Sequence, residues 1–337
     1  MKPYLSRYTP STIPHARKPV RGSLIWWLRF LGVVAFFIIL LQLPKNQDVH
    51  LARIDLRWLG LCMLLAILQL LLDAFVWHWL LVMQRIRHPY PKTLVAYLAS
   101  QYLGLVTPGH VGEYLAAGYI SMETGITFGY ALSSVVVKRI LAWVVVAGFG
   151  VWGLDLFARL PRLEGMQWMV LTTLVVLLIL AAAITIWMVS LRRLAKKWKK
   201  LSPWQIDMTE FWAGMHSLLS LRLIFPLAMA ALAFALLFVQ LDAVLHALGI
   251  TLPLGQVSKI VAFSRVVGRL IPLSVVGFGS KDAATIEMLA QHGIDPTVGL
   301  TVTLVLLLCS YLVTLLLSGL CWWIKPLVIR RAGRSSS

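Results

Sequence analysis

The sequence predicts an all-α polytopic membrane protein, with about six full spans and two re-entrant or broken helical hairpins arranged as an inverted repeat. Hydrophobic residues make up 59% of the 337-residue chain and charged residues 13%, whereas about a quarter of the residues in globular domains are charged. No stretch between the apolar runs is long enough to bury a core of its own. Any chemistry is therefore expected within or beside the bilayer.

Six apolar runs are long enough to cross the hydrocarbon layer, which takes about 20 helical residues for about 30 Å. They are Leu24–Leu43, Trp58–Met83, Ile126–Leu154, Trp168–Ser190, Leu223–Leu248 and Thr297–Ile324. Tryptophans lie near the ends of several runs, where the indole ring favours the membrane interface. Six crossings would return the C-terminus to the side of the N-terminus.

Basic residues are concentrated in four patches without acids, at residues 2–21, 85–92, 192–200 and 325–334, whereas the other loops mix both signs. This is the positive-inside pattern, so the net charge of +18 reports topology and contact with anionic lipid headgroups, not nucleic acid. It predicts a multi-pass protein of a bacterial-type cell inner membrane with both termini in the cytoplasm.

Two further apolar segments are interrupted by clusters of glycine and proline. Residues 92–125 are broken at Pro108, Gly109 and Gly112, and residues 256–293 are broken at Pro272, Gly277 and Gly279. Backbone groups at such breaks cannot face lipid, so each break should be buried in protein or line a wet cavity.

The two halves of the chain resemble each other in spacing. Gly109 and Gly125 are 16 residues apart, as are Gly277 and Gly293, and a Leu-Asp-Ala triplet recurs after 169 residues, around Asp73 and Asp242. Because the number of spans between the hairpins is odd, the hairpins would enter from opposite sides, as in inverted-repeat transporters. The predicted organisation is a basic tail (1–23), a first repeat (24–155), a second repeat (156–324) and a second tail (325–337).

Charged residues cluster around the two breaks, although a charge costs about 2.5 to 3.5 kcal/mol at the centre of a span on insertion scales. The candidate substrate-binding residues are Glu113, Lys138, Arg139, Arg265, Arg269, Lys281 and Asp282. Guanidinium groups bind phosphate bidentately, which suits a lipid headgroup. Alternatively the two carboxylates only cap helices, and the cations only neutralise a buried network.

Asp73 and Asp242 are single acids in apolar runs, and His246 follows Asp242 by one helical turn. They are candidates for proton coupling, although the sequence favours static pairing with a cation. The chain has no Walker motif, nucleophile elbow or metal-ligand spacing, so no cofactor or metal is expected. Residues 203–222 predict either an amphipathic interfacial helix or a tilted extension of the fifth span.

Three blocks, at residues 105–113, 135–140 and 271–284, resemble the signature blocks of the flippase-like family. This family includes the transmembrane region of lysylphosphatidylglycerol synthase/flippase proteins and uncharacterised inner-membrane relatives. The family pattern Gly-x-Gly-x-Arg-Glu is replaced here by Gly277 to Asp282, and Lys138 stands where an acid often precedes the arginine. No aminoacyl-transfer domain follows Ile324, so the resemblance implies membrane translocation of a lipid and not aminoacylation.

The sequence therefore favours a non-enzymatic transporter that flips a phospholipid or a polyprenyl-phosphate-linked headgroup. A secondary transporter of a small anionic solute and an intramembrane lipid transferase are the alternatives. The expected partners are membrane lipids, with a homo-oligomer or a lipid-modifying enzyme also compatible with the sequence.

Overall fold

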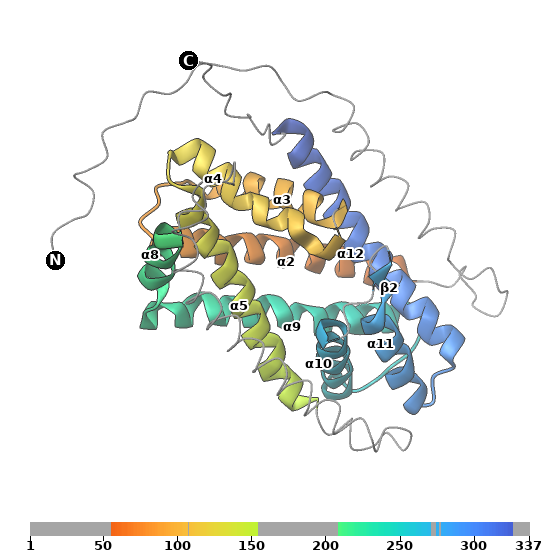
Figure 1. The fold of residues 1–337 in the computed structure, drawn as a ribbon. Coiled ribbons are helices and arrows are strands. Elements are labelled where there is room, and N and C mark those ends of the chain that lie inside the picture. The colour runs from red at the N-terminus through yellow and green to blue at the C-terminus, as the bar shows by residue number, and fades with distance from the viewer. Residues whose placement is uncertain (1–54, 107, 154–207, 271–273, 276–277, 326–337) are drawn as a thin grey trace, which may run out of the picture.

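The computed structural model describes residues 55–106, 108–153, 208–270, 274–275 and 278–325 (Figure 1). Four long helices cross the described part of the chain: α2 (Leu56–Met83), α5 (Phe128–Trp152), α9 (Ile224–Ala247) and α12 (Pro296–Ile324). Each is long and apolar enough to span a membrane. They confirm four of the six predicted runs, while the runs 24–43 and 168–190 and most of both tails lie outside the described residues.

Both predicted hairpins are pairs of helices interrupted by a short break. In the first, α3 (Tyr90–Val106) is followed by the 3-10 helix η3 (Pro108–Leu115) and by α4 (Ala116–Thr124). In the second, α10 (Leu254–Leu270) is followed by a two-stranded turn of β1 (Ser274–Val275) and β2 (Phe278–Gly279), and then by α11 (Ser280–Gln291).

The two breaks differ in structure, whereas the helices that lead into them have the same length. The first break is a 3-10 helix, since proline lacks the N–H but has the backbone angle that the first position of a helix requires. The leading helix of each hairpin has 17 residues, about 26 Å.

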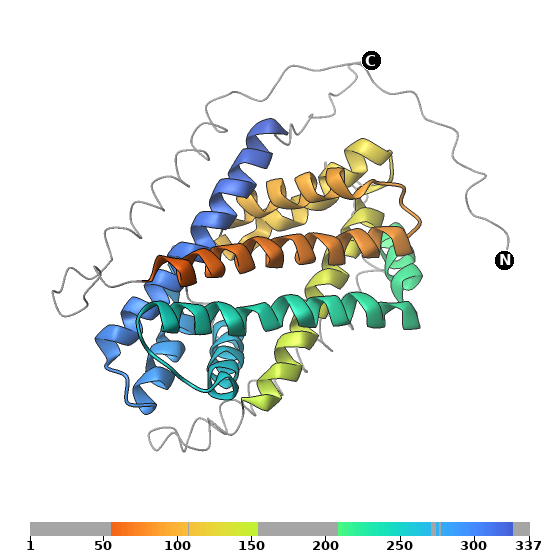
Figure 2. The same ribbon diagram turned by 180° about the vertical axis from the view of Figure 1, so that it is seen from behind.

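Helices α2 and α9 lie side by side and antiparallel (Figure 2). The backbone N–H of Asp55 donates to the carbonyl of Ala247 at 3.2 Å. Gln240 donates to the side chain of Gln69 at 3.0 Å, and at the other end of α2 the ring centroids of Trp79 and Phe225 are 4.5 Å apart. The first long helices of the two halves therefore run in opposite directions.

The ends of the helices meet at two opposite ends of the bundle. At the basic end, which contains Arg85, Arg87, Lys92 and Lys325, the side chain of Gln84 at the end of α2 donates to Ser133 near the start of α5 at 2.6 Å. The far end contains the start of α2 and the end of α9. Helices α3 and α4 thus form a hairpin from the basic end, and α10 and α11 form one from the far end (Figure 1).

Each hairpin packs against the last long helix of the other half. Tyr102 on α3 stacks on Trp322 of α12 with a centroid distance of 5.1 Å, and Val266 on α10 lies against Gly150 of α5. Because each hairpin packs on a helix of the other half, the tips of both hairpins reach the middle of the bundle.

A separate short helix, α8 (Met208–Leu218), lies across the basic end. Phe211, Gly214 and Leu218 are buried on one face, against α5, while His216 and Ser217 are exposed. The 3-10 turn η4 (Leu221–Leu223) separates α8 from α9. Residues 208–218 therefore form an amphipathic helix, and the alternative of an extension of α9 was wrong.

Candidate functional site

Lys138 and Arg139 lie halfway along α5, where the tip of the first hairpin meets it. Arg139 Nη2 donates to Glu113 Oε2 at 2.8 Å, and its guanidinium lies 5.0 Å from the ring centroid of Tyr114. Glu113 lies within η3, two residues before Leu115, the N-cap residue of α4. Its carboxylate pairs with a cation of the neighbouring helix.

Lys138 points to a different set of partners, as expected for neighbours that project about 100° apart on a helix. Its Nζ donates to the hydroxyl of Tyr97 at 2.9 Å and lies 4.0 Å from Asp73 Oδ1. Asp73 therefore forms the static pair with a cation that the sequence favoured. His78, which follows Asp73 on α2, is not part of this pair, and its Nδ1 lies 3.3 Å from the hydroxyl of Thr93 on α3.

The second hairpin brings three cations toward the same region. Arg269, in the last turn of α10, lies within electrostatic reach of Glu113, Asp73 and Arg139. Its guanidinium also lies 5.0 Å from the ring centroid of Trp143 on α5. Arg265, one turn earlier on α10, interacts with Arg269, Lys281 and Asp282. These electrostatic interactions connect both hairpin tips in one group of charges.

Asp282 supports the start of α11. Its Oδ2 accepts the backbone N–H of Gly279 at 2.8 Å, and its Oδ1 lies 3.3 Å from Lys281 Nζ. The side chain is buried. Capping and charge pairing therefore coexist at Asp282, because a carboxylate at a helix N-terminus satisfies free N–H groups and interacts well with the helix dipole.

Small residues let the two breaks approach their leading helices. A Cβ atom on Gly104 would lie 2.6 Å from Glu113 Cγ, and one on Gly268 would lie 2.8 Å from Lys281 Cβ. Both glycines are the fifteenth residue of a 17-residue helix. Of the predicted turn residues, Pro108 and Gly109 open η3 and Gly112 contacts the backbone of α3, whereas Pro272 and Gly277 lie outside the described residues.

One predicted pair lies apart from this charge cluster. Asp242 and His246 are near the far end of α9, with Asp242 Oδ2 and His246 Nδ1 3.5 Å apart, and His246 stacks on Trp58 at 4.7 Å. The three residues proposed for proton coupling therefore do not meet, since only Asp73 lies within the charge cluster.

Three aromatic residues of the charge cluster could not be predicted from the sequence. Tyr97, Tyr114 and Trp143 each contact one of its cations. An aromatic residue in an apolar run gives no signal of its own, because most such residues only pack in a core. Their partners become visible only when the hairpins are placed against α5.

The charge cluster has an excess of positive charge among the residues that the structure describes. Its five cations, Lys138, Arg139, Arg265, Arg269 and Lys281, face the three carboxylates Asp73, Glu113 and Asp282. The formal excess is two positive charges. An anion with a similar charge would therefore complete the neutralisation of this partly buried region.

A second polar group fastens the first hairpin at the basic end. Glu123, in the last turn of α4, pairs with Lys325 at the end of α12 and accepts from His88 Nε2 at 3.1 Å. Burial opposes ionisation of Glu123, but the hydrogen bonds from Lys325 and His88 outweigh it and lower its pKa from the ordinary value of 4.5. The pair joins the hairpin to the other half of the protein.

Within the described ranges, no three His, Cys, Asp or Glu side chains are grouped closely enough to bind a metal ion together. The cations of the charge cluster are able to bind an anion such as phosphate.

Residues 24–318 match the family of the lysylphosphatidylglycerol synthase TM region. The chain belongs to this family. The match covers both hairpins, the charge cluster, three of the four described long helices and most of the fourth, α12, so this family member is a membrane protein, as the resemblance of its three sequence blocks indicated. No curated protein and no solved structure gives a significant match to this family member.

Proposed function

We propose that this protein translocates an anionic lipid headgroup, that of a phospholipid or of a polyprenyl-phosphate-linked lipid, across the cell inner membrane. The observation that carries the proposal is the charge cluster between two hairpins that enter the bundle from opposite ends. A phosphodiester headgroup would balance one of the two unmatched positive charges, and a diphosphate headgroup would balance both.

The cost of placing cations inside the helix bundle supports a ligand at this place. Each charge within a span costs about 2.5 to 3.5 kcal/mol on insertion scales, and the three carboxylates balance only part of the five cations. Arginine binds phosphate through two parallel hydrogen bonds. A phosphate ligand gives a physical reason for Arg265 and Arg269, one turn apart on α10.

The matching order of helices supports an inverted repeat as the basis of alternating access. The sequence long helix, 17-residue helix, break, short helix and long helix occurs from α2 to α5 and again from α9 to α12. Gly125 and Gly293, which follow the two hairpins, both have a left-handed backbone, with φ of 72° and 80°. In such transporters a central site opens to each side in turn. We place both termini in the cytoplasm, because the basic patches favour that side.

The proposal is tested with purified protein in vesicles of phosphatidylglycerol and phosphatidylethanolamine that contain a trace of fluorescent phosphatidylglycerol. Dithionite bleaches only the outer leaflet, so translocation appears as bleaching beyond the outer-leaflet fraction. Fluorescent polyprenyl phosphate is tested in the same way.

The decisive variant is the double substitution Arg265→Gln and Arg269→Gln. Hydrogen bonds to charged groups contribute about 1.5 to 3 kcal/mol each, so we expect a loss of at least about tenfold in rate. Arg57→Gln is the control, because Arg57 is an exposed arginine at the start of α2. A double variant that is correctly folded and flips both lipids at the wild-type rate would contradict the proposal.

The same vesicles separate the two other functions. Uptake of a soluble phosphate ester, without movement of lipid, would indicate the secondary transporter of a small anion. A change in the mass of the lipid would indicate an intramembrane transferase, in which Glu113 or Asp282 would act as the base. A lipid-modifying enzyme or a second copy of the chain remains a compatible partner.

A further inference from the structure

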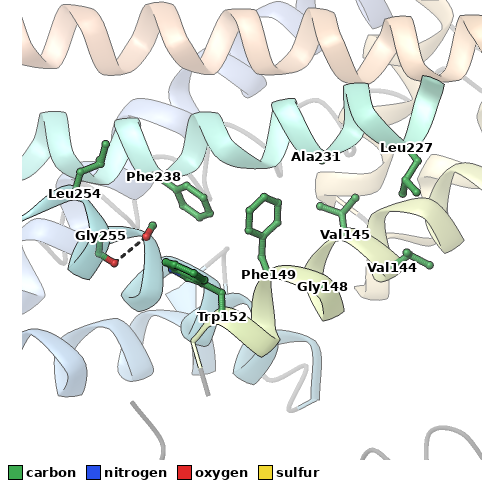
Figure 3. Close-up of a pocket in the computed structure, with 11 residues that line it drawn as sticks. Val144, Val145, Gly148, Phe149, Trp152, Leu227, Ala231, Phe238, Leu254 and Gly255 are labelled. Atoms are coloured by element: carbon green, nitrogen blue, oxygen red, sulfur yellow. Dashed lines mark hydrogen bonds between the residues drawn. The ribbon is translucent and has the colours of Figure 1, made fainter. Parts of the chain in front are cut away.

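An open apolar groove lies between α5 and α9 and ends at the start of α10 (Figure 3). The groove has a volume of about 690 Å³ and is lined by residues that include Val145, Gly148, Phe149, Ala231, Phe238 and Ser258. This volume is within the range of about 300 to 1,000 Å³ that is typical of ligand sites.

The walls of the groove offer almost no polar contact. Ser258 is the one lining residue with a polar side chain apart from the indole of Trp152, and its hydroxyl donates to the carbonyl of Gly255 at 2.8 Å. The other walls are aliphatic or aromatic side chains on helices whose backbone groups bond to each other. The groove therefore suits hydrocarbon and does not suit a soluble anion.

The groove is elongated, and helix α5 connects it to the charge cluster. From Leu227 to Phe238, α9 lines about 16 Å of it. On α5, Val144 lines the groove, while the adjacent Trp143 contacts Arg269 of the charge cluster. Two adjacent residues of α5 thus reach the apolar groove and the charge cluster. This arrangement matches a ligand with an anionic head and an apolar tail.

We propose that this groove binds one hydrocarbon tail of the transported lipid while the headgroup is at the charge cluster. This inference rests on the proposed function and adds a tail site to it. It identifies a long-chain lipid as the substrate class, because the groove would remain empty with a small anion. The tail remains in apolar surroundings during transport, so only the headgroup needs the cations.

Two glycines allow the groove to be filled without disturbing the fold. A Cβ atom on Gly148 or on Gly255 would have no other atom within 4 Å. Gly148→Leu and Gly255→Leu therefore add a side chain to the groove alone. Gly60→Leu is the matched control, because Gly60 on α2 also has open space around it and does not line the groove.

The test is photo-crosslinking of the full chain in phosphatidylglycerol vesicles that contain phosphatidylglycerol with a diazirine in the middle of one acyl chain. We expect label on residues 144–152 and 227–238. Gly148→Leu should reduce this label about tenfold, the effect of displacing about two buried methylene groups, and Gly60→Leu should leave it unchanged.

The outcomes separate this inference from the proposed function. The tail site alone would be overturned if lipid flipping is fast but crosslinking to the groove is no stronger than to the exposed Leu64 of α2. Crosslinking to the groove that is unaffected by Gly148→Leu would be part of the same result. Groove label without flipping would support the tail site and overturn the function. A single disulfide between Gly148→Cys and a cysteine placed within residues 154–207, formed in full yield, would show that the chain itself covers the groove and would overturn the inference.

Discussion

Gly112 provides the sharpest test of how the first hairpin is built. It lies in η3, where a Cβ atom would collide with the carbonyl group of Leu103 and would lie 2.6 Å from the backbone nitrogen of Gly104. These are main-chain atoms of α3, so no side-chain rotation relieves the collision. Since carbon atoms pack at about 3.5 Å or more, η3 and α3 would have to separate by about 1 Å in Gly112→Ala.

The separation has two costs. Overpacking of a buried site typically costs about 1 to 3 kcal/mol, and main-chain contacts place this site at the upper end. A movement of about 1 Å would also stretch the 2.8 Å bond between Arg139 and Glu113 beyond hydrogen-bond range. We therefore expect Gly112→Ala to lose about 3 kcal/mol or more of stability, together with most of its transport.

The assay combines thermal unfolding in mild detergent with the dithionite measurement. A loss of about 3 kcal/mol should lower the Tm by at least about 5 °C. Gly60→Ala is the control, because its Cβ meets no atom within 4 Å, alanine favours helix, and Gly60 does not line the groove. Gly104→Ala should fall between the two, since its Cβ meets the side chain of Glu113 and not main chain. An unchanged Tm and transport rate in Gly112→Ala would refute the packing of η3 on α3.

Three other predictions follow from the ion pairs and the hairpins. Arg139→Gln should cost about 2 to 3 kcal/mol, somewhat less than a fully buried pair because both side chains are partly exposed, and adding Glu113→Gln should restore part of this loss in thermal unfolding. Glu123 has a lowered pKa in the folded state, so its stabilising contribution is complete above the unfolded value of 4.5 and is lost as the pH falls through the folded pKa. The Tm of the wild type should therefore fall more steeply in acid than that of Glu123→Gln, and parallel curves would contradict this. A reporter cysteine beside Glu113 should react mainly from the cytoplasmic side and one beside Asp282 mainly from the opposite side, and equal reactivity from one side would exclude alternating access.

The sequence alone determined the class of the protein and the position of its breaks. Apolar runs of about 20 residues and acid-free basic patches are local features, and the bilayer imposes the same length and charge rules on every span. For this reason four long helices and both hairpins were predicted close to their observed bounds. The three blocks around Glu113, Arg139 and Asp282 also predicted the family to which the chain belongs.

Only the tertiary structure decided which charges meet. Glu113 and Arg139 are 26 residues apart, and Arg269 reaches them from the other half of the chain. The sequence named Asp73, Asp242 and His246 as candidates for proton coupling, and the packing of the helices places Asp73 in the charge cluster and the other two near the far end. The roles of Tyr97 and Trp143 and the groove beside α5 depend on the same packing. Pairing across helices is set by the relative position of whole elements, which no local pattern in the chain encodes.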